Sequence, residues 1–238
     1  GLAWVAGHYF IAQEWHGNGY ATTFLLAFLL TSVGLVVLRL GIREPDAPRL
    51  RPVLPLRDRM SQFGELLQHR DFRAFLVAHG LAAVGRVGLP FWTLFIGDRL
   101  GLDGALIGSL SLAFLAADTM SNLVWGSLGD RIGFRAVYLG SLLCSLAGLA
   151  LLVLGDGWLV YASFVALGFG FSGWMMAAVT LVLEFGAHED IPMRLALTTT
   201  VAGGVSSVGP ILVGLSIAAL GYAPLLVAAF AALIGSLA

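Results

Sequence analysis

The chain has 238 residues, of which 58% are apolar and only 11% are charged, and its formal net charge is −1. Soluble proteins carry about 25% charged residues, so this composition excludes a secreted globular domain, a disordered chain and a soluble enzyme. All 13 basic residues are arginines, and without an excess of positive charge we expect no nucleic-acid partner. The single Cys144 excludes a disulfide framework.

Long charge-free intervals predict membrane-spanning helices. A bilayer core about 30 Å thick requires roughly 20 apolar residues per helix, and residues 136–155 and 157–183 contain no Asp, Glu, Arg or Lys. Residues 195–238 are also free of these charges, and Gly221 with Pro224 marks a turn that divides them. We therefore predict an all-α polytopic membrane protein, a bundle of seven transmembrane helices plus a fragment, with spans at 1–12 (the fragment), 21–40, 74–97, 104–128, 134–154, 157–184, 194–219 and 222–238.

Residues 41–73 form the longest polar stretch and separate the spans into two groups. Four prolines in the first half favour an extended linker. In the second half, apolar residues at helical spacing predict an amphipathic helix on the membrane surface, with a plain connector as the alternative.

Arginine placement predicts the orientation, because cytoplasmic loops of membrane proteins are enriched in basic residues. Alternating spans put segments 39–73, 126–135 and 184–194 on one side, and these segments hold eleven arginines, whereas the other side holds Arg99 alone. We expect the loops 41–73, 126–135 and 184–194 to be cytoplasmic. The expected location is the plasma membrane, which in a bacterium is the cytoplasmic membrane.

The segment from residue 126 to residue 135 reads GSLGDRIGFR. It resembles the signature loop of the major facilitator superfamily, a Gly-x-Leu-small-Asp-Arg-x-Gly-Arg-Lys pattern between the second and third helices of each six-helix lobe. Phe134 departs from this pattern at a position where a basic residue is common. The matching residues are Gly126, Leu128, Asp130, Arg131, Gly133 and Arg135.

The resemblance implies that this chain is part of a two-lobed transporter. Residues 74–238 would be the C-terminal six-helix lobe, truncated in helix twelve. Residues 1–40 would be the end of helix five and helix six, and residues 41–73 the cytoplasmic inter-lobe linker. The N-terminal lobe of the same full-length protein would then be a partner, together with the lipid bilayer.

The physical chemistry of the signature segment fits a gate. Gly126 and Gly133 permit a tight turn close to neighbouring backbone, and Asp130 is suited to cap a helix N-terminus. Arg131 and Arg135 can bind anionic headgroups or acids on the facing lobe. An ordinary basic interhelical loop is the alternative.

Two charged residues lie deep in the predicted spans, Arg86 and Asp118. At about 1.5 Å per residue, both lie roughly 18–20 Å from the cytoplasmic face on consecutive antiparallel helices, so they are placed to meet. One interpretation is a cavity ion pair that binds a charged substrate or releases a proton, and the other is a fixed pair that joins two helices. Asn122, one turn from Asp118, shares its helix face.

Other residues in the spans are weaker candidates. Trp92 and Trp174 are candidates for stacking on a substrate, although tryptophans in membrane helices more often pack or anchor at interfaces. Pro90 is expected to kink its helix beside the cavity. Close packing or bending is expected in the helix 194–219, at Gly204, Gly209, Pro210 and Gly214.

Two further patterns suggest enzymes or cofactors and are set aside. Gly168, Gly170 and Gly173 have the spacing of a nucleotide-binding fingerprint, but no strand precedes them, so small residues at a helix crossing explain them better. His188 lacks a second histidine nearby, so we expect no metal site, and we expect no cofactor.

The expected function is secondary active transport of a small solute by alternating access, with protons as a candidate coupling ion and efflux as one candidate direction. The protein is not expected to be an enzyme. Two alternatives stay open: an intramembrane enzyme around Ser172 or His188, and a non-transporting receptor or scaffold of the same family.

Overall fold

The computed structural model describes residues 19–41, 63–101, 104–186 and 190–237. The chain divides into two compact units, residues 1–59 and 60–238, and the boundary between them lies inside the predicted linker. In the first unit the described element is α2 (Gly19–Gly41), which contains the predicted span 21–40. The fragment predicted at 1–12 lies outside the described residues.

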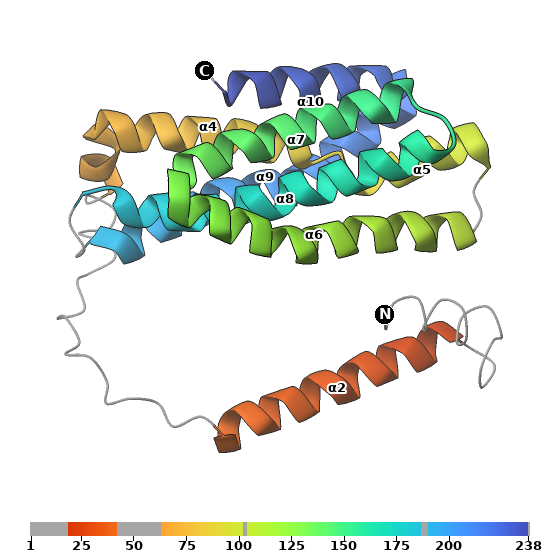
Figure 1. Ribbon diagram of the computed structural model, residues 1–238, viewed down its shortest axis with the longest axis horizontal. Coiled ribbons are helices and arrows are strands. Elements are labelled where there is room, and N and C mark those ends of the chain that lie inside the picture. Colours follow the sequence, from red (N-terminus) through yellow and green to blue (C-terminus); the bar gives the residue numbers. More distant parts are fainter. Residues whose placement is uncertain (1–18, 42–62, 102–103, 187–189, 238) are drawn as a thin grey trace. The chain divides into compact units, whose positions relative to one another are not determined.

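The second unit is a bundle of helices (Figure 1). Residues 63–68 add a short helical segment before it, and Leu66 in that segment is buried. Leu225, Ala229 and Leu233 bury one side of the last helix against the core. The helices of the bundle are α4 (Arg70–Arg86), α5 (Leu89–Leu100), α6 (Gly104–Ile132), α7 (Phe134–Leu154), α8 (Trp158–Glu184), α9 (Ile191–Leu220) and α10 (Ala223–Gly235).

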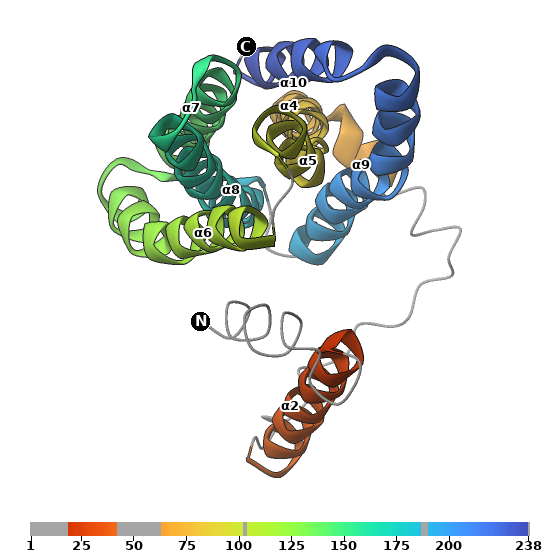
Figure 2. The ribbon, with the colours of Figure 1, turned by 90° about the vertical axis from the view of Figure 1, so that its right-hand side faces the viewer.

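The helices of this unit form two groups around α4 and α5. Helix α8 packs on both α6 and α7, whereas α4 packs on α9 and α10. Figure 2, which looks along the helices, shows α4 and α5 between the α6–α7–α8 group and the α9–α10 pair. Side chains on α4 therefore face the centre of the unit.

The helix lengths confirm the prediction of an all-α polytopic membrane protein. Six helical segments among the described residues are long and apolar enough to cross a membrane, and α10 is a shorter apolar helix. The spans predicted at 134–154 and 157–184 agree with α7 and α8 to within one residue at each end.

The span predicted at 74–97 is not a single smooth helix. It begins earlier, at Arg70, and it breaks between Arg86 and Leu89, before the proline that was expected to kink it. Pro90 lies in the first turn of α5, where its missing N–H costs no hydrogen bond. The break instead lies at Gly88, where an added Cβ would overlap the Trp92 ring folded back on it.

Glycines on α8 allow the bundle to pack closely, as expected of small residues at a helix crossing. An added Cβ at Gly168 would overlap the Phe114 carbonyl of α6, and one at Gly170 would overlap Ser145 of α7. At Gly173, an added Cβ would lie 2.7 Å from the Trp125 ring. The Trp125 indole N–H also donates a 2.8 Å hydrogen bond to the Phe169 carbonyl of α8.

Helix α9 continues through Pro210 to Leu220. Of the small residues predicted to pack or bend there, Gly209 packs against the Val87 side chain. A Cβ added at Gly209 would lie 2.7 Å from that side chain. Gly204 and Gly214 have no neighbouring atom within 4 Å of an added Cβ. Of these three glycines, only Gly209 therefore has a close neighbour from another part of the unit, the junction between α4 and α5.

Candidate functional site

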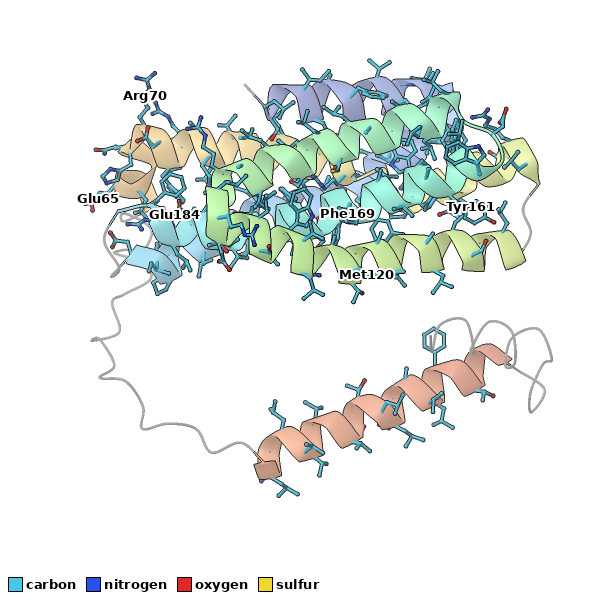
Figure 3. All side chains as sticks on the ribbon, in the orientation of Figure 1. Glu65, Arg70, Met120, Tyr161, Phe169 and Glu184 are labelled. Atoms are coloured by element: carbon cyan, nitrogen blue, oxygen red, sulfur yellow. The ribbon has the colours of Figure 1, made fainter. Side chains whose placement is uncertain are left out.

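Charged residues mark the two ends of the bundle. Arg70 and Arg73 begin α4, Arg131 and Arg135 flank the α6–α7 corner, and Arg194 lies near the start of α9. Because consecutive spans run in opposite directions, with α4 and α5 together forming one span, these five share one end, where Figure 3 labels Arg70, Glu65 and Glu184. Among the arginines of the described bundle, Arg99 lies at the other end and Arg86 lies between.

At the opposite end, Arg99 joins α5 to the end of α7. Its guanidinium donates to the Leu152 carbonyl at 3.3 Å and to the Asp156 carboxylate at 3.1 Å. The negative end of the α7 dipole favours a positive charge at this position. Nearby, burial and then the Asp98 carboxylate raise the pKa of Tyr222.

The segment that resembles the signature loop is mostly helical, which corrects the prediction of a loop over 126–135. Helix α6 continues to Ile132, and Gly133 alone separates it from α7. Gly133 has a φ of 88°, which residues other than glycine rarely adopt, and its N–H donates to the Gly129 carbonyl at 2.9 Å. The segment is therefore a tight corner between two helices.

Phe134, the residue that departs from the family pattern, packs on Gly129. An added Cβ at Gly129 would lie 2.6 Å from the Phe134 ring. Leu128 is half-buried against the core, whereas an added Cβ at Gly126 would meet no atom within 4 Å. Within this unit, the corner depends on the small residue at 129 and does not require a glycine at 126.

Asp130 does not cap α7, contrary to expectation. It lies in the last turn of α6, and the residue at the N-cap of α7 is Gly133, which has no side chain to accept a hydrogen bond. Asp130, Arg131 and Arg135 are all exposed, and no salt bridge in the described part of the chain involves them. These charges are free to contact groups outside the unit.

Arg86, at the end of α4, turns into the centre of the unit and is 8% exposed. Its guanidinium donates to the Ala82 carbonyl at 3.1 Å, the Ser145 hydroxyl of α7 at 3.0 Å and the Gly170 carbonyl of α8 at 3.3 Å. It also lies over the Trp174 ring, 4.7 Å from the ring centroid. Arg86 thus holds α4, α7 and α8 together.

The predicted ion pair between Arg86 and Asp118 is not formed in this structure. The contacts of Arg86 are with neutral acceptors and an indole ring. Asp118 is half-buried on α6. The prediction rested on the equal depth of the two residues in the membrane. Depth does not determine toward which neighbouring helix a side chain points. Asn122 donates to the backbone carbonyl of Asp118 at 2.8 Å.

Sequence reasoning missed His79 as part of this centre. Its ring is 3% exposed and lies between two aromatic rings, with centroids 5.7 Å from Phe75 and 4.9 Å from Trp174. The spacing from Arg86 could have indicated this position, because residues seven apart share one helix face. Nothing in the sequence indicated that His79 contacts Trp174 of α8.

Neither candidate stacking tryptophan faces an open surface here. Trp174 is 5% exposed and contacts His79 and Arg86, and Trp92 is 1% exposed. The serine of the enzyme alternative, Ser172, is also buried, and His188 lies outside the described residues. A substrate would therefore have to displace packed side chains to reach any of the three that are described.

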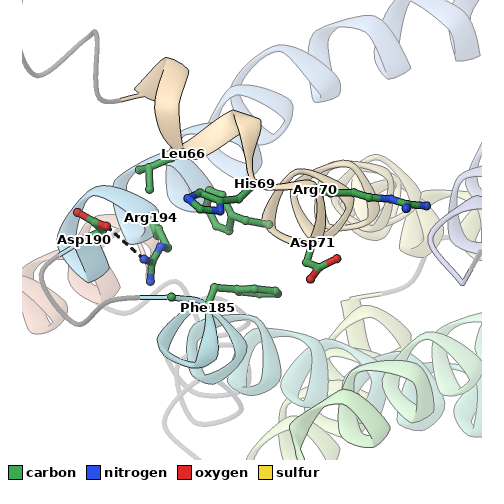
Figure 4. Close-up of a pocket in the computed structure, with 9 residues that line it drawn as sticks. Leu66, His69, Arg70, Asp71, Phe185, Asp190 and Arg194 are labelled. Atoms are coloured by element: carbon green, nitrogen blue, oxygen red, sulfur yellow. Dashed lines mark hydrogen bonds and ion pairs between the residues drawn. The ribbon is translucent and has the colours of Figure 1, made fainter.

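A pocket of about 320 Å³ lies at the arginine-rich end, between the starts of α4 and α9 and the end of α8 (Figure 4). Arg194 is buried there and donates to Asp190 at 3.4 Å. Gly186, with a φ of 57°, brings its backbone close to the Arg194 guanidinium. In Figure 4, Arg70 points away from the pocket. The lining residues are Leu66, His69, Arg70, Asp71, Phe72, Phe185, Gly186, Asp190 and Arg194.

The comparisons with known proteins cover most of the second unit. Residues 74–238 match the family model of the Major Facilitator Superfamily. The uncharacterized MFS-type transporter YfnC of Bacillus subtilis (strain 168) is 29% identical to the chain over 153 residues, which cover 62% of this chain and 36% of that protein. The chain thus spans little more than a third of the length of this relative.

Proposed function

Because the chain belongs to the major facilitator superfamily, we propose that the whole protein moves a small solute across a membrane by alternating access, as a secondary active transporter. The family match over residues 74–238 carries this proposal. The six apolar segments long enough to cross a membrane support it. Residues 74–238 then form the C-terminal lobe, and the span 21–40 is helix six of the N-terminal lobe.

The α6–α7 corner is the proposed gate element of this lobe. Asp130, Arg131 and Arg135 are exposed there, and the Gly133 turn holds them at the end of two long helices. In the proposed mechanism, they contact the N-terminal lobe or lipid headgroups when the cytoplasmic side closes, and the contacts break when it opens. The corner moves as one body because its turn is a single residue.

The gate proposal is tested on the full-length protein with Asp130→Asn. Uptake and efflux of a panel of labelled sugars, amino acids, nucleosides and dyes are measured in membrane vesicles that contain or lack the protein. We expect a solute that only protein-containing vesicles move, and a rate at least about tenfold lower in Asp130→Asn, since a hydrogen bond to a charged group contributes about 1.5–3 kcal/mol.

Asp156→Asn is the matched control, because it removes an exposed acid at the other end of the bundle. It should transport at nearly the wild-type rate. If the wild-type protein moves no solute of the panel while remaining folded, the enzyme and receptor alternatives are favoured. If Asp130→Asn and Asp156→Asn transport equally well, Asp130 is not part of the gate.

A further inference from the structure

Helix α6 presents two chemically different sides outside its contact with α8. Leu110, Ala117 and Trp125 are buried on the contact side. At 100° per residue, the exposed Leu112, Met120, Leu123 and Val124 fall on one of the remaining sides, at 42%, 69%, 81% and 51% exposure. Figure 3 shows Met120 on the side of α6 away from α8. This apolar side has the composition of a lipid-facing surface.

Asp118 lies on the opposite, more polar flank of α6. Ser111, Asp118 and Asn122 are seven and four residues apart, so they form one stripe along the helix, interrupted only by Leu115. A carboxylate in the middle of a membrane span is too costly to face lipid, so it faces protein or water. The polar stripe is therefore the side of α6 that faces protein or water in the assembled protein.

No basic group of the described bundle neutralises Asp118. Arg86, the arginine nearest to it in depth, is 8% exposed and is engaged by Ser145 and by carbonyl groups of α4 and α8. The other arginines of the described bundle lie at its two ends. The lobe thus buries the positive charge of Arg86 in the middle of its span, whereas the negative charge of Asp118 lies on a partly exposed side of α6.

An amide side chain lies one turn after Asp118 on α6, and an aromatic pair lies one turn before it. The Asn122 side-chain N–H donates a 2.8 Å hydrogen bond to the backbone carbonyl of Asp118. The side-chain amide oxygen of Asn122 is then left to accept a hydrogen bond. Phe114, one turn before Asp118, and Phe171 of α8 are half-buried, with ring centroids 5.9 Å apart. Gly168 brings the α8 backbone against residues 114–118, and Phe171, three residues later on α8, contacts the Phe114 ring.

We propose that Asp118 binds the positively charged group of an organic cation, and that the solute of the proposed transporter belongs to this class. The carboxylate supplies the opposite charge, the Asn122 oxygen accepts a hydrogen bond, and the Phe114–Phe171 pair supplies aromatic rings that attract a cation. An anion would meet an unneutralised carboxylate with no basic group of the described bundle beside it. The inference rests on the proposed transport function, because the polar side of α6 lines the pathway only in the two-lobed protein.

The test measures binding of two ions of nearly equal size and opposite charge, tetraphenylphosphonium and tetraphenylborate, to the purified full-length protein in detergent. We expect the wild-type protein to prefer the cation. Asp118→Asn should weaken cation binding at least about tenfold, Asp118→Glu should retain most of it, and Phe114→Leu should weaken it severalfold. Asp98→Asn, at the end of α5, is the control and should bind like the wild type.

The same preparations separate this inference from the proposed function. Equal cation affinity in the wild type, Asp118→Asn and Phe114→Leu would overturn it, and so would a wild-type protein without preference for the cation. Cation binding that depends on Asp118, in a protein that moves no solute in vesicles, would overturn transport alone. Transport that persists while Asp118→Asn leaves cation affinity unchanged would overturn the cation site alone.

Discussion

At the scale of single residues, Arg86 shows how a buried cation is accommodated without an acidic partner. It lies at the end of α4, where the negative end of the helix dipole favours a positive charge. Its N–H groups reach carbonyl oxygens of α4 and α8 and the Ser145 hydroxyl, and one face of the guanidinium rests on Trp174. These contacts support the structural interpretation of this arginine over a role in the cavity.

Replacing Arg86 should therefore destabilise the lobe. In Arg86→Ala, the Ser145 hydroxyl and the Gly170 carbonyl lose a donor and a cavity opens beside Trp174, which together should cost about 2–4 kcal/mol. Arg99→Ala, which removes a partly exposed ion pair, should cost less than about 1 kcal/mol. Thermal unfolding of the full-length protein in detergent measures both. Equal Tm values for the two variants would contradict the structural role.

The same residues show how far sequence reasoning reaches into the site. The depth of Arg86 and Asp118 followed from counting residues along a helix, and the acidic residue on an exposed corner followed from the family pattern. The pairing of Arg86 did not follow, because its partners Ser145 and Gly170 are neutral and lie 59 and 84 residues away. A hydroxyl and a backbone carbonyl leave no charge signal in the sequence.

At the scale of elements, helix lengths were predictable and helix junctions were not. Apolar runs set α7 and α8 because the membrane requires a fixed length. The corner between α6 and α7 was predicted as a loop because its charges interrupt the apolar run, yet charged residues continue a helix well once it extends beyond the apolar region. The break was expected at Pro90 but lies at Gly88, where the Trp92 ring packs. The sequence pattern alone does not reveal this packing.

Alanine substitutions at two glycines of the signature segment are expected to have different effects on stability. Gly133→Ala forces a side chain into a conformation open mainly to glycine, which should cost about 1–3 kcal/mol, and should lower both Tm and transport. Gly126→Ala meets no atom within 4 Å in this lobe, so its Tm should equal or exceed that of the wild type.

Transport by Gly126→Ala should nevertheless fall if Gly126 faces the N-terminal lobe, as the proposed gate requires. Vesicle transport and thermal unfolding, measured on the same preparations of the full-length protein, distinguish the two effects. A Gly126→Ala variant with the wild-type rate would show that the facing lobe does not approach this glycine closely. A Gly133→Ala variant with the wild-type Tm would show that the corner relaxes around a side chain.

At the scale of the whole molecule, charge distribution relates the ends of the bundle to the two sides of a membrane. Five arginines of the described bundle lie at the end that carries the α6–α7 corner, and Arg99 lies at the other end in a contact with Asp156. Basic residues are retained on the cytoplasmic side of membrane proteins. We therefore predict that the proposed gate closes the cytoplasmic side and that the α7–α8 junction faces outward.

This orientation is tested with single cysteines in a cysteine-free background, since native Cys144 lies within α7. Ile132→Cys stands at the corner and Trp158→Cys at the opposite end, and both native side chains are well exposed, at 60% and 75%. A membrane-impermeant maleimide should label Trp158→Cys in intact cells and Ile132→Cys only in inverted vesicles. The reverse pattern would place the arginine-rich end outside the cytoplasm. It would also transfer the proposed gate to the outer face, since the corner and the five arginines lie at the same end of the bundle.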